Sequence, residues 1–140
     1  VNNLRKFEFI IAAGGIVENN SKEWLFIFRN GIWDLPKGKV EKNERLEFAA
    51  EREISEECGL SEMRLDSFIS KTYHMYYENE VIKLKETHWF LFYSNQLKNL
   101  KPQLEEGITN LKWVSISDLE AILSNSFFSI KEIVKAHLLN

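Results

Sequence analysis

The segment formed by residues 38–60 constrains the fold of this chain more than any other. Leu46, Ala50 and Ile54 recur at every fourth position, so one side of the segment is apolar. That period predicts an amphipathic α-helix that packs its apolar side on a hydrophobic core. Asn43 is the predicted N-cap of a helix beginning near Glu44, and Gly59 is its predicted left-handed C-terminal residue.

Three glutamates lie in the last turns of this predicted helix. Glu53, Glu56 and Glu57 occupy positions i, i+3 and i+4, which places them on one face with neighbouring Cβ atoms roughly 5–6 Å apart. Carboxylates so close together repel one another unless a cation lies among them, and Mg²⁺ prefers such oxygen ligands beside substrate phosphates. The alternative is a solvated acidic helix face, which is what most charge runs form.

The fixed positions of the segment resemble, in their complete order, the signature of the Nudix hydrolase family, whose prototype is MutT. The order is Gly38, five residues, Glu44, seven residues, Arg52-Glu53-Ile54, one residue, Glu56-Glu57, one residue and Gly59-Leu60. The resemblance implies an α/β fold, an α/β/α sandwich around a mixed central sheet. It also implies a metal-dependent pyrophosphohydrolase that cleaves a nucleoside diphosphate linked to another moiety.

The resemblance also assigns roles to individual residues. The expected ligands of Mg²⁺ or Mn²⁺ are the carbonyl of Gly38 and the carboxylates of Glu53, Glu56 and Glu57. Arg52 and Glu44, eight residues apart, correspond to the ion pair that orients the glutamates in this family. Which glutamate also serves as the general base stays open.

Other charged residues are candidates outside the signature. Glu105 and Glu106 lie on a later loop, and Glu106 is the candidate general base, with an ordinary loop acid as the competing interpretation. Arg29 and Lys37 flank the loop that leads to the helix, so we expect them to contact phosphate, with Lys39 as a further candidate.

The substrate is less constrained than the reaction. The stretch Trp33-Asp34-Leu35-Pro36-Lys37-Gly38 is more similar to the dinucleoside polyphosphate hydrolases than to the enzymes that hydrolyse 8-oxo-dGTP. A dinucleoside polyphosphate or a (d)NTP is therefore the expected substrate. The alternative function is a non-catalytic Nudix-like regulatory domain that binds a nucleotide, but such domains usually carry an eroded signature, and here every position is filled.

Length and composition narrow the setting. The 140 residues predict one domain, 1–140, and the net charge of −3 argues against a broad nucleic-acid surface. No apolar run reaches the roughly 18 residues of a membrane helix. The single cysteine, Cys58, excludes an internal disulfide and favours a reducing compartment, so a cytoplasmic protein is expected. Homodimerisation stays open, with a strand edge or the Phe127-Phe128 pair as candidate contacts.

Hydrophobic periodicity predicts the remaining elements. The expected strands cover residues 7–17, 24–29, 32–35, 63–77, 81–94 and 111–114, and two further helices cover 118–123, capped by Ser117, and 127–139. Gly14-Gly15 indicates a close backbone approach, and Asn30-Gly31 indicates a hairpin. Aromatic residues on the long hairpin could stack on a base or fill the core, and alternation places Tyr73 and His74 on opposite faces.

Overall fold

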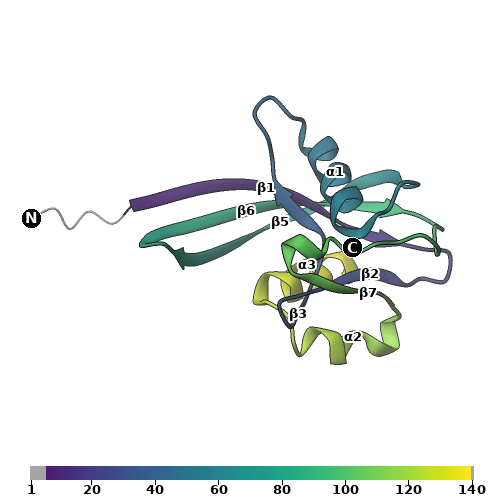
Figure 1. Cartoon of the computed structure of the whole chain (residues 1–140). Coiled ribbons are helices and arrows are strands. Elements are labelled where there is room, and N and C mark those ends of the chain that lie inside the picture. The colour runs from purple at the N-terminus through teal and green to yellow at the C-terminus, as the bar shows by residue number, and fades with distance from the viewer. Residues whose placement is uncertain (1–5, 140) are drawn as a thin grey trace, which may run out of the picture.

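A mixed seven-stranded sheet runs through the centre of the structure (Figure 1). This computed structural model describes residues 6–139, so the two ends of the predicted domain 1–140 lie outside the described residues. The strands are β1 (Lys6–Glu18), β2 (Trp24–Arg29), β3 (Ile32–Asp34), β4 (Lys37–Lys39), β5 (Arg64–Glu78), β6 (Val81–Tyr93) and β7 (Ile108–Val114). The helices are α1 (Leu46–Cys58), α2 (Ile116–Leu123) and α3 (Phe128–Leu138), with a 3₁₀ turn η1 (Leu104–Glu106).

The strand order is β3-β2-β1-β6-β5, with β4 added to β1 and β7 added to β2. β1 and β6 pair in parallel along their whole length, from Lys6 opposite Val81 to Glu18 opposite Tyr93. The other strand pairs are antiparallel. The sheet is therefore mixed, as the resemblance implied.

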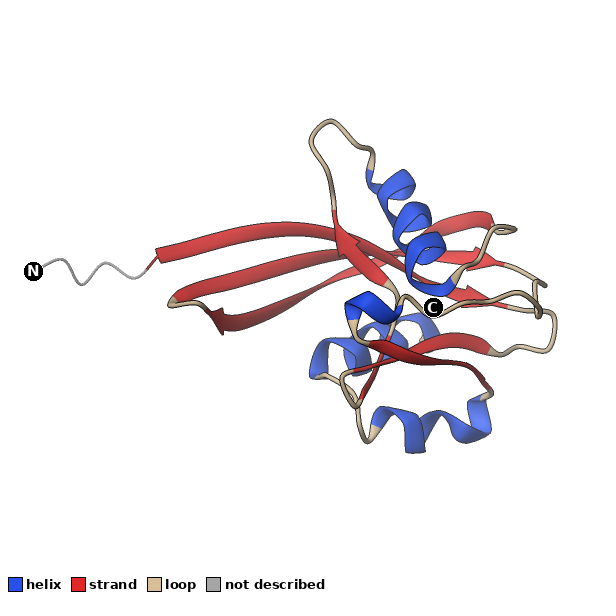
Figure 2. Cartoon of the chain, viewed as in Figure 1, coloured by secondary structure: helices blue, strands red, loops and turns tan. Residues whose placement is uncertain are grey.

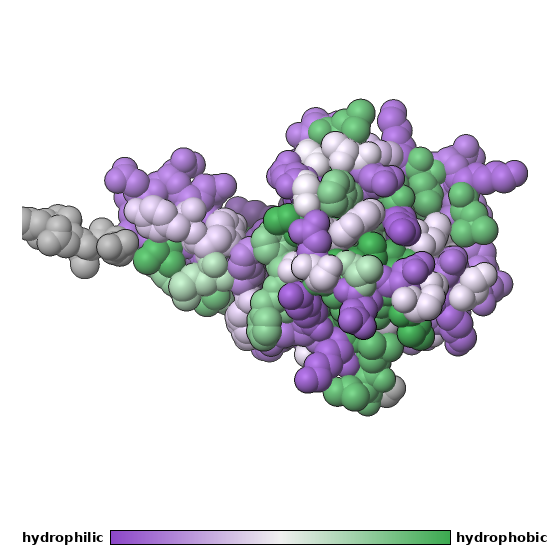
Figure 3. Space-filling model, turned by 90° about the horizontal axis from the view of Figure 1, so that it is seen from below, coloured by the Kyte–Doolittle hydropathy of each residue, from purple (hydrophilic) through white to green (hydrophobic). Residues whose placement is uncertain are grey.

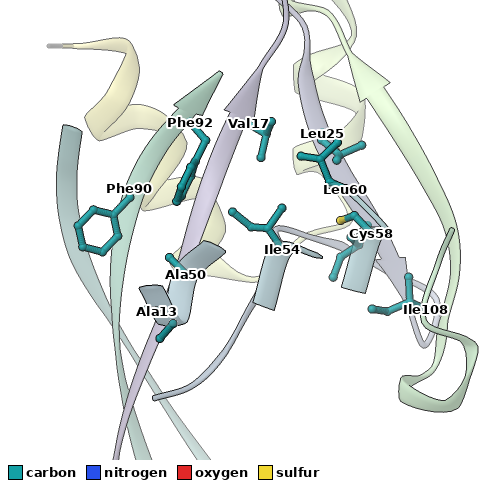
Figure 4. Close-up of a cluster of buried hydrophobic side chains, with 12 residues drawn as sticks. Ala13, Val17, Leu25, Ala50, Ile54, Cys58, Leu60, Phe90, Phe92 and Ile108 are labelled. Atoms are coloured by element: carbon teal, nitrogen blue, oxygen red, sulfur yellow. The ribbon is translucent and has the colours of Figure 1, made fainter. Parts of the chain in front are cut away.

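Helices cover both faces of this sheet, with α1 on one side and α2 and α3 on the other (Figure 2). Under α1, Ala50 and Ile54 pack with Val17 and Phe92 in a fully buried cluster (Figure 4). Each large apolar side chain buried in this way contributes about 1.5–3 kcal/mol relative to leaving it exposed. The expected α/β/α sandwich is confirmed.

The second core lies between the sheet and the pair α2 and α3. Trp89 and Phe26 are its largest buried side chains, and Ile130 and Ile133 of α3 pack on them. The indole nitrogen of Trp89 donates a 2.8 Å hydrogen bond to the Thr72 hydroxyl, so this hairpin aromatic residue belongs to the core and not to a substrate site.

Two adjacent glycines let other backbone and side-chain atoms approach β1. A Cβ at Gly15 would lie 2.8 Å from Phe92 and 2.9 Å from Ile54, so α1 can pack this closely on β1 only where the strand has no side chain. A Cβ at Gly14 would lie 2.3 Å from the Pro36 carbonyl oxygen, which accepts a hydrogen bond from the Gly15 amide. The predicted close backbone approach is confirmed.

Some predicted boundaries are wrong. α1 begins at Leu46 after the N-cap Arg45, because Asn43 has a left-handed backbone with φ of 64° and belongs to the preceding loop. α2 begins at Ile116, and its N-cap is Ser115 and not the predicted Ser117. The segment after Pro36 is a short strand, β4, and not only a loop. No helix within residues 6–139 is long and apolar enough to cross a membrane.

Candidate active site

The core beneath α1 fixes the orientation of the acidic C-terminal end of this helix. Ile54 and Cys58 are fully buried, so the helix positions beside them are held at the edge of the core. Glu57 is 4% exposed, Glu53 is partly buried and Glu56 is exposed. The three predicted glutamates therefore share one helix face, but their surroundings range from the core to solvent.

Arg52 connects the signature residues on one side of this face. Its Nε and one terminal nitrogen donate to the two carboxylate oxygens of Glu44 at 2.7 and 2.9 Å. The other terminal nitrogen donates to Glu53 at 2.7 Å and to Glu56 at 2.8 Å. The carbonyl of Lys39 also accepts a 3.0 Å hydrogen bond from Arg52. A bidentate contact of this kind fixes the orientation of both partners.

The Arg52 contacts change the protonation of the groups around them. The hydrogen bonds from Arg52, with one from the Glu41 amide, lower the pKa of Glu44 to about 2. The same pairing with Glu44 raises the pKa of Arg52. Burial raises the pKa of Glu53, although its hydrogen bond from Arg52 acts in the opposite direction. Glu44 is therefore a fixed anion, whereas Glu53 is partly desolvated.

Gly38 lies directly against Glu53. It is in the middle of β4, opposite Ala13 of β1, on the side of the sheet that α1 covers. A Cβ at this position would lie 2.1 Å from the carboxylate carbon of Glu53. The strand and the carboxylate can approach this closely only because residue 38 has no side chain.

Glu57, one helical turn after Glu53, forms an ion pair with Arg29 at the end of β2, in which the carboxylate is buried and the guanidinium partly exposed. The amide of Lys37 donates a 3.1 Å hydrogen bond to the same carboxylate. Burial raises the pKa of Glu57 to about 7, although the charges of Arg29 and Lys37 act to lower it. The Nε of Arg29 is buried without a hydrogen-bond partner among the described residues.

Lys37 forms an ion pair that the sequence did not indicate. Its ammonium group lies 2.6 Å from the carboxylate of Asp34, which is 2% exposed. The side chain of Lys37 points to the sheet face of α2 and α3, because Lys37 pairs with Gly14 and Gly38 with Ala13. Lys39 is exposed, and its contact to the cluster is the carbonyl bond to Arg52.

The long hairpin supplies a second group of side chains near Lys37. Lys85 lies opposite His74, and its ammonium group is 5.5 Å from the ring centre of Tyr76. Burial, and next the charge of Lys37, lowers the pKa of both His74 and Lys85. The rings of His74 and Phe127 are 5.1 Å apart. Strand alternation separated His74 from Tyr73 correctly, but it gave no signal for Lys85.

The predicted loop acids are on η1, next to the end of α1. The amide of Gln103 donates to the Glu57 carbonyl at 3.1 Å, and the Gly107 carbonyl accepts from the Asn30 amide at 3.0 Å. These bonds hold η1 between the end of α1 and the β2–β3 turn. Glu105 and Glu106 are both exposed there.

The donor set fits a hard divalent cation. Within residues 6–139, no three His, Cys, Asp or Glu side chains already converge as a metal cluster, because Arg52 and Arg29 hold the glutamates. The carboxylates of α1 and the backbone of Gly38 are nevertheless adjacent, and oxygen donors of these two kinds are the ligands that Mg²⁺ takes. The residues therefore suit such an ion chemically.

Comparisons with known proteins identify the family of the chain. The family model of the NUDIX domain matches residues 8–135. The 8-oxo-dGTP diphosphatase of Buchnera aphidicola subsp. Acyrthosiphon pisum (strain APS) is 32% identical over 95 residues, which are 68% of this chain and 69% of that protein. The crystal structure of the MutT protein from Methanosarcina mazei Go1 has a TM-score of 0.69 and 24% identity, and the alignment covers 95% of this chain and 94% of that one.

A second solved structure has the same fold. The C. elegans Ap4A hydrolase in a binary complex superposes with a TM-score of 0.72 at 20% identity, covering 93% of this chain and 96% of that one. The chain belongs to the Nudix family, because the family model spans nearly all of it. It is a Nudix pyrophosphohydrolase, the enzyme class that the sequence predicted.

Proposed function

We propose that this protein hydrolyses a pyrophosphate linkage in a nucleoside polyphosphate, either a dinucleoside polyphosphate or a (d)NTP. The observation that carries the proposal is the close approach of the Glu53 carboxylate to Gly38, together with the hydrogen bonds of Arg52 to Glu53 and Glu56. The names of two similar proteins, an 8-oxo-dGTP diphosphatase and an Ap4A hydrolase, support the same substrate class.

Glu53, Glu56, Glu57 and the carbonyl of Gly38 would hold Mg²⁺ or Mn²⁺. Such an ion supplies charge neutralisation on the phosphate oxygens and lowers the pKa of a bound water. Arg52 is a positioning residue, since it contacts Glu53 and Glu56 while its bidentate bond to Glu44 fixes it. Orientation of this kind by outer groups typically contributes 10–100-fold to activity.

The cationic side chains beside the glutamates are suited to the phosphate chain. Arg29 has an unpartnered buried Nε, and Lys37 lies between the carboxylate of Asp34 and the hairpin. We propose that Arg29 and Lys37 bind phosphate and that the exposed Lys39 adds a weaker long-range attraction. His74 and Phe127 offer neighbouring flat rings on which a nucleobase can stack.

We propose Glu106 as the general base that takes a proton from the attacking water. The position of η1 beside the end of α1 supports this role, because the Gln103 amide just before η1 donates a hydrogen bond to the Glu57 carbonyl and the two acids are exposed. Glu105 is the matched comparison. Loss of the acidic limb of the pH–rate profile in Glu106→Gln, with a normal profile in Glu105→Gln, is the expected result, because a general base acts only when it is deprotonated.

The test of the proposed function is phosphate release from a nucleotide panel with Mg²⁺ or Mn²⁺. The panel contains diadenosine polyphosphates, (d)NTPs with 8-oxo-dGTP, ADP-ribose, nucleotide sugars and diphosphoinositol phosphates, with chromatographic identification of products. Glu57→Gln should lower the rate on the order of a thousandfold, because a metal contact is worth several kcal/mol in the transition state. The control is Glu51→Gln, an exposed acid of the same helix.

A preference for diadenosine polyphosphates would select the first substrate class, and a preference for (d)NTPs the second. The proposal is wrong if no member of the panel is hydrolysed while nucleotide binding is retained, which is the behaviour of a regulatory domain. It is also wrong if Glu57→Gln and Glu51→Gln are equally active. Circular dichroism of both variants shows whether the fold is kept.

A further inference from the structure

A three-stranded arm extends beyond the helices. It consists of residues 6–11 of β1, 73–78 of β5 and 81–86 of β6, and it leaves the body as a twisted ribbon (Figures 1 and 2). Elsewhere the sheet is covered by α1 on one face and by α2 and α3 on the other. The strands of the arm are therefore longer than the core of the domain requires.

The two faces of the arm differ in polarity, because paired residues of neighbouring strands share a face. Phe7 pairs with Ile82, which pairs with Tyr77, and the next row on the same face is Phe9, Leu84 and Met75. The opposite face carries Glu8, Lys83 and Tyr76. Figure 3 shows hydrophilic residues gathered along one side of the arm and hydrophobic residues along the other.

The apolar face of the arm is open to solvent. It is defined by Phe7, Phe9, Met75, Tyr77, Ile82 and Leu84. Four of its side chains are exposed, with exposed fractions of 59% at Phe7, 50% at Phe9, 64% at Met75 and 60% at Tyr77. Further along β1 the same face is fully buried, since Ala13 packs under α1. In space, α1 covers β1 only beyond Ile11. The carbonyl of Ile11 accepts a hydrogen bond from the Val40 amide, at the start of the loop that leads to the helix.

We propose that the apolar face of the arm is the interface of a two-fold symmetric homodimer, in which the arms of two copies pack face to face. The four large side chains expose on the order of 450 Å² in each copy, taking roughly 200 Å² for each full side chain. Two arms together then bury about 900 Å² from these side chains, and the partly exposed Ile82 and Leu84 bring the total near the roughly 1,000 Å² that a specific interface needs. Single apolar residues scattered over a surface are normal, but a contiguous apolar patch of roughly a few hundred Å² often marks an interaction site.

The arrangement of charges selects an antiparallel packing of the two arms. A two-fold axis at the row of Phe9 and Met75 places the β5–β6 turn of one copy over the base of the other arm. The exposed acid Glu80 is in that turn, and the exposed Lys71, opposite His88, is at the base on the same face. Each end of the interface therefore brings a carboxylate to an ammonium group, and the same surface serves both copies.

α1 limits how far the two arms can overlap. It lies on the same sheet face as the apolar side chains of the arm, so it forms a wall at the base. Packed sheets are about 10 Å apart, which leaves the second arm beside the helix and not above it. The tip of one arm then meets the first turn of α1 in the other copy, where Phe48 is 59% exposed.

Sedimentation velocity over a concentration series tests this dimer. For the wild type we expect a dimer with a dissociation constant on the order of 10 µM, as suits a small interface. Met75→Glu should weaken association at least about tenfold, because a charge would be buried at the centre of the interface. Phe128→Glu is the control, since Phe128 is 75% exposed but lies on α3 outside the arm.

A charge exchange tests the antiparallel orientation. Glu80→Lys and Lys71→Glu should each weaken the dimer several-fold, and the double variant should restore most of the loss. A wild type that stays monomeric at ten times the expected constant would overturn the proposal, as would a Met75→Glu variant that dimerises like the wild type. Weakening by Phe128→Glu alone would move the interface to α3 and overturn it too.

Discussion

Two arginine–glutamate clusters lie on either side of the acidic face of α1, and they hold their charges in opposite ways. In the Arg52 cluster, hydrogen bonds from the guanidinium lower the pKa of Glu44 to about 2. In the Arg29 cluster, the pKa of Glu57 is raised to about 7 although a guanidinium is paired with it. Both carboxylates have the same kind of partner, so the partner does not explain the difference.

Burial explains it. The side chain of Glu57 is 5% exposed and that of Glu44 is 17% exposed, and removal from water favours the neutral form of a carboxyl group. Glu53, between them, is bound by Arg52 but has its pKa raised by burial. The signature therefore identifies which acids are present, whereas depth in the fold decides which of them are ionised.

The largest effect that would sharpen this comparison is expected for Arg29→Met at high pH. Removing the guanidinium leaves the buried Glu57 carboxylate unpaired, which costs about 3 kcal/mol in the free energy of unfolding at pH 8. At pH 5 the loss should be much smaller, because Glu57, with its pKa raised to about 7, is protonated in the folded protein. Guanidinium denaturation at the two pH values measures both.

Arg52→Met is the matched variant of the other cluster. The carboxylates it leaves behind are partly solvated, so the loss should be nearer 1 kcal/mol. It should grow less between pH 5 and pH 8 than the loss in Arg29→Met, because Glu44, the bidentate partner of Arg52, is ionised throughout that range. Equal pH dependence in the two variants would contradict the distinction between the clusters.

The sequence predicted the parts of the fold and site that depend on local order. The signature on residues 38–60 indicated the family, and with it the sandwich and the acids proposed to bind metal, because its fixed positions lie on one helix and the segment before it. The Asn30-Gly31 hairpin was also predictable from the sequence. Both residues have a positive φ, 49° and 81°, and Asn-Gly is one of the few residue pairs that favour this conformation.

Contacts between distant segments could not be predicted in this way. β4 exists because it pairs with β1 at Gly14, some twenty residues earlier, and a Pro-Lys-Gly sequence alone indicates a loop. Lys85 joins the site only through the parallel pairing of β6 with β1 and its position opposite His74. The start of α1 was misplaced because Asn43, a favourable cap residue, adopts a left-handed backbone instead.

Gly38→Ala tests Glu53, the acid between the two clusters, and its expected effect on the rate of hydrolysis is intermediate in size. The added methyl group would lie 2.1 Å from the Glu53 carboxylate carbon, so that flexible carboxylate has to move while the backbone stays in place. We expect hydrolysis to fall roughly 10–100-fold, as for other displaced ligands, with little change in stability. Lys39→Ala, an exposed neighbour on the same strand, is the comparison and should lower the rate far less, because Lys39 contributes only a weak long-range attraction. A wild-type rate in Gly38→Ala would show that hydrolysis does not depend on the present position of the Glu53 carboxylate.

The smallest expected effect is that of Glu44→Gln on stability, and it should disappear at a lower pH than the effect of Arg29→Met. The folded pKa of Glu44 is about 2, below its ordinary value of 4.5, so its ionised form stabilises the folded protein above that ordinary value. The contribution is lost as the pH falls through about 2. Because the pair is partly solvated, the substitution should cost under about 1 kcal/mol at pH 7. Denaturation of both proteins at pH 7, 4 and 2.5 measures the difference in the free energy of unfolding, which should shrink towards low pH. A Glu44→Gln variant as stable as the wild type at pH 7 would contradict the lowered pKa of Glu44, because an ionised, paired carboxylate stabilises the folded protein there.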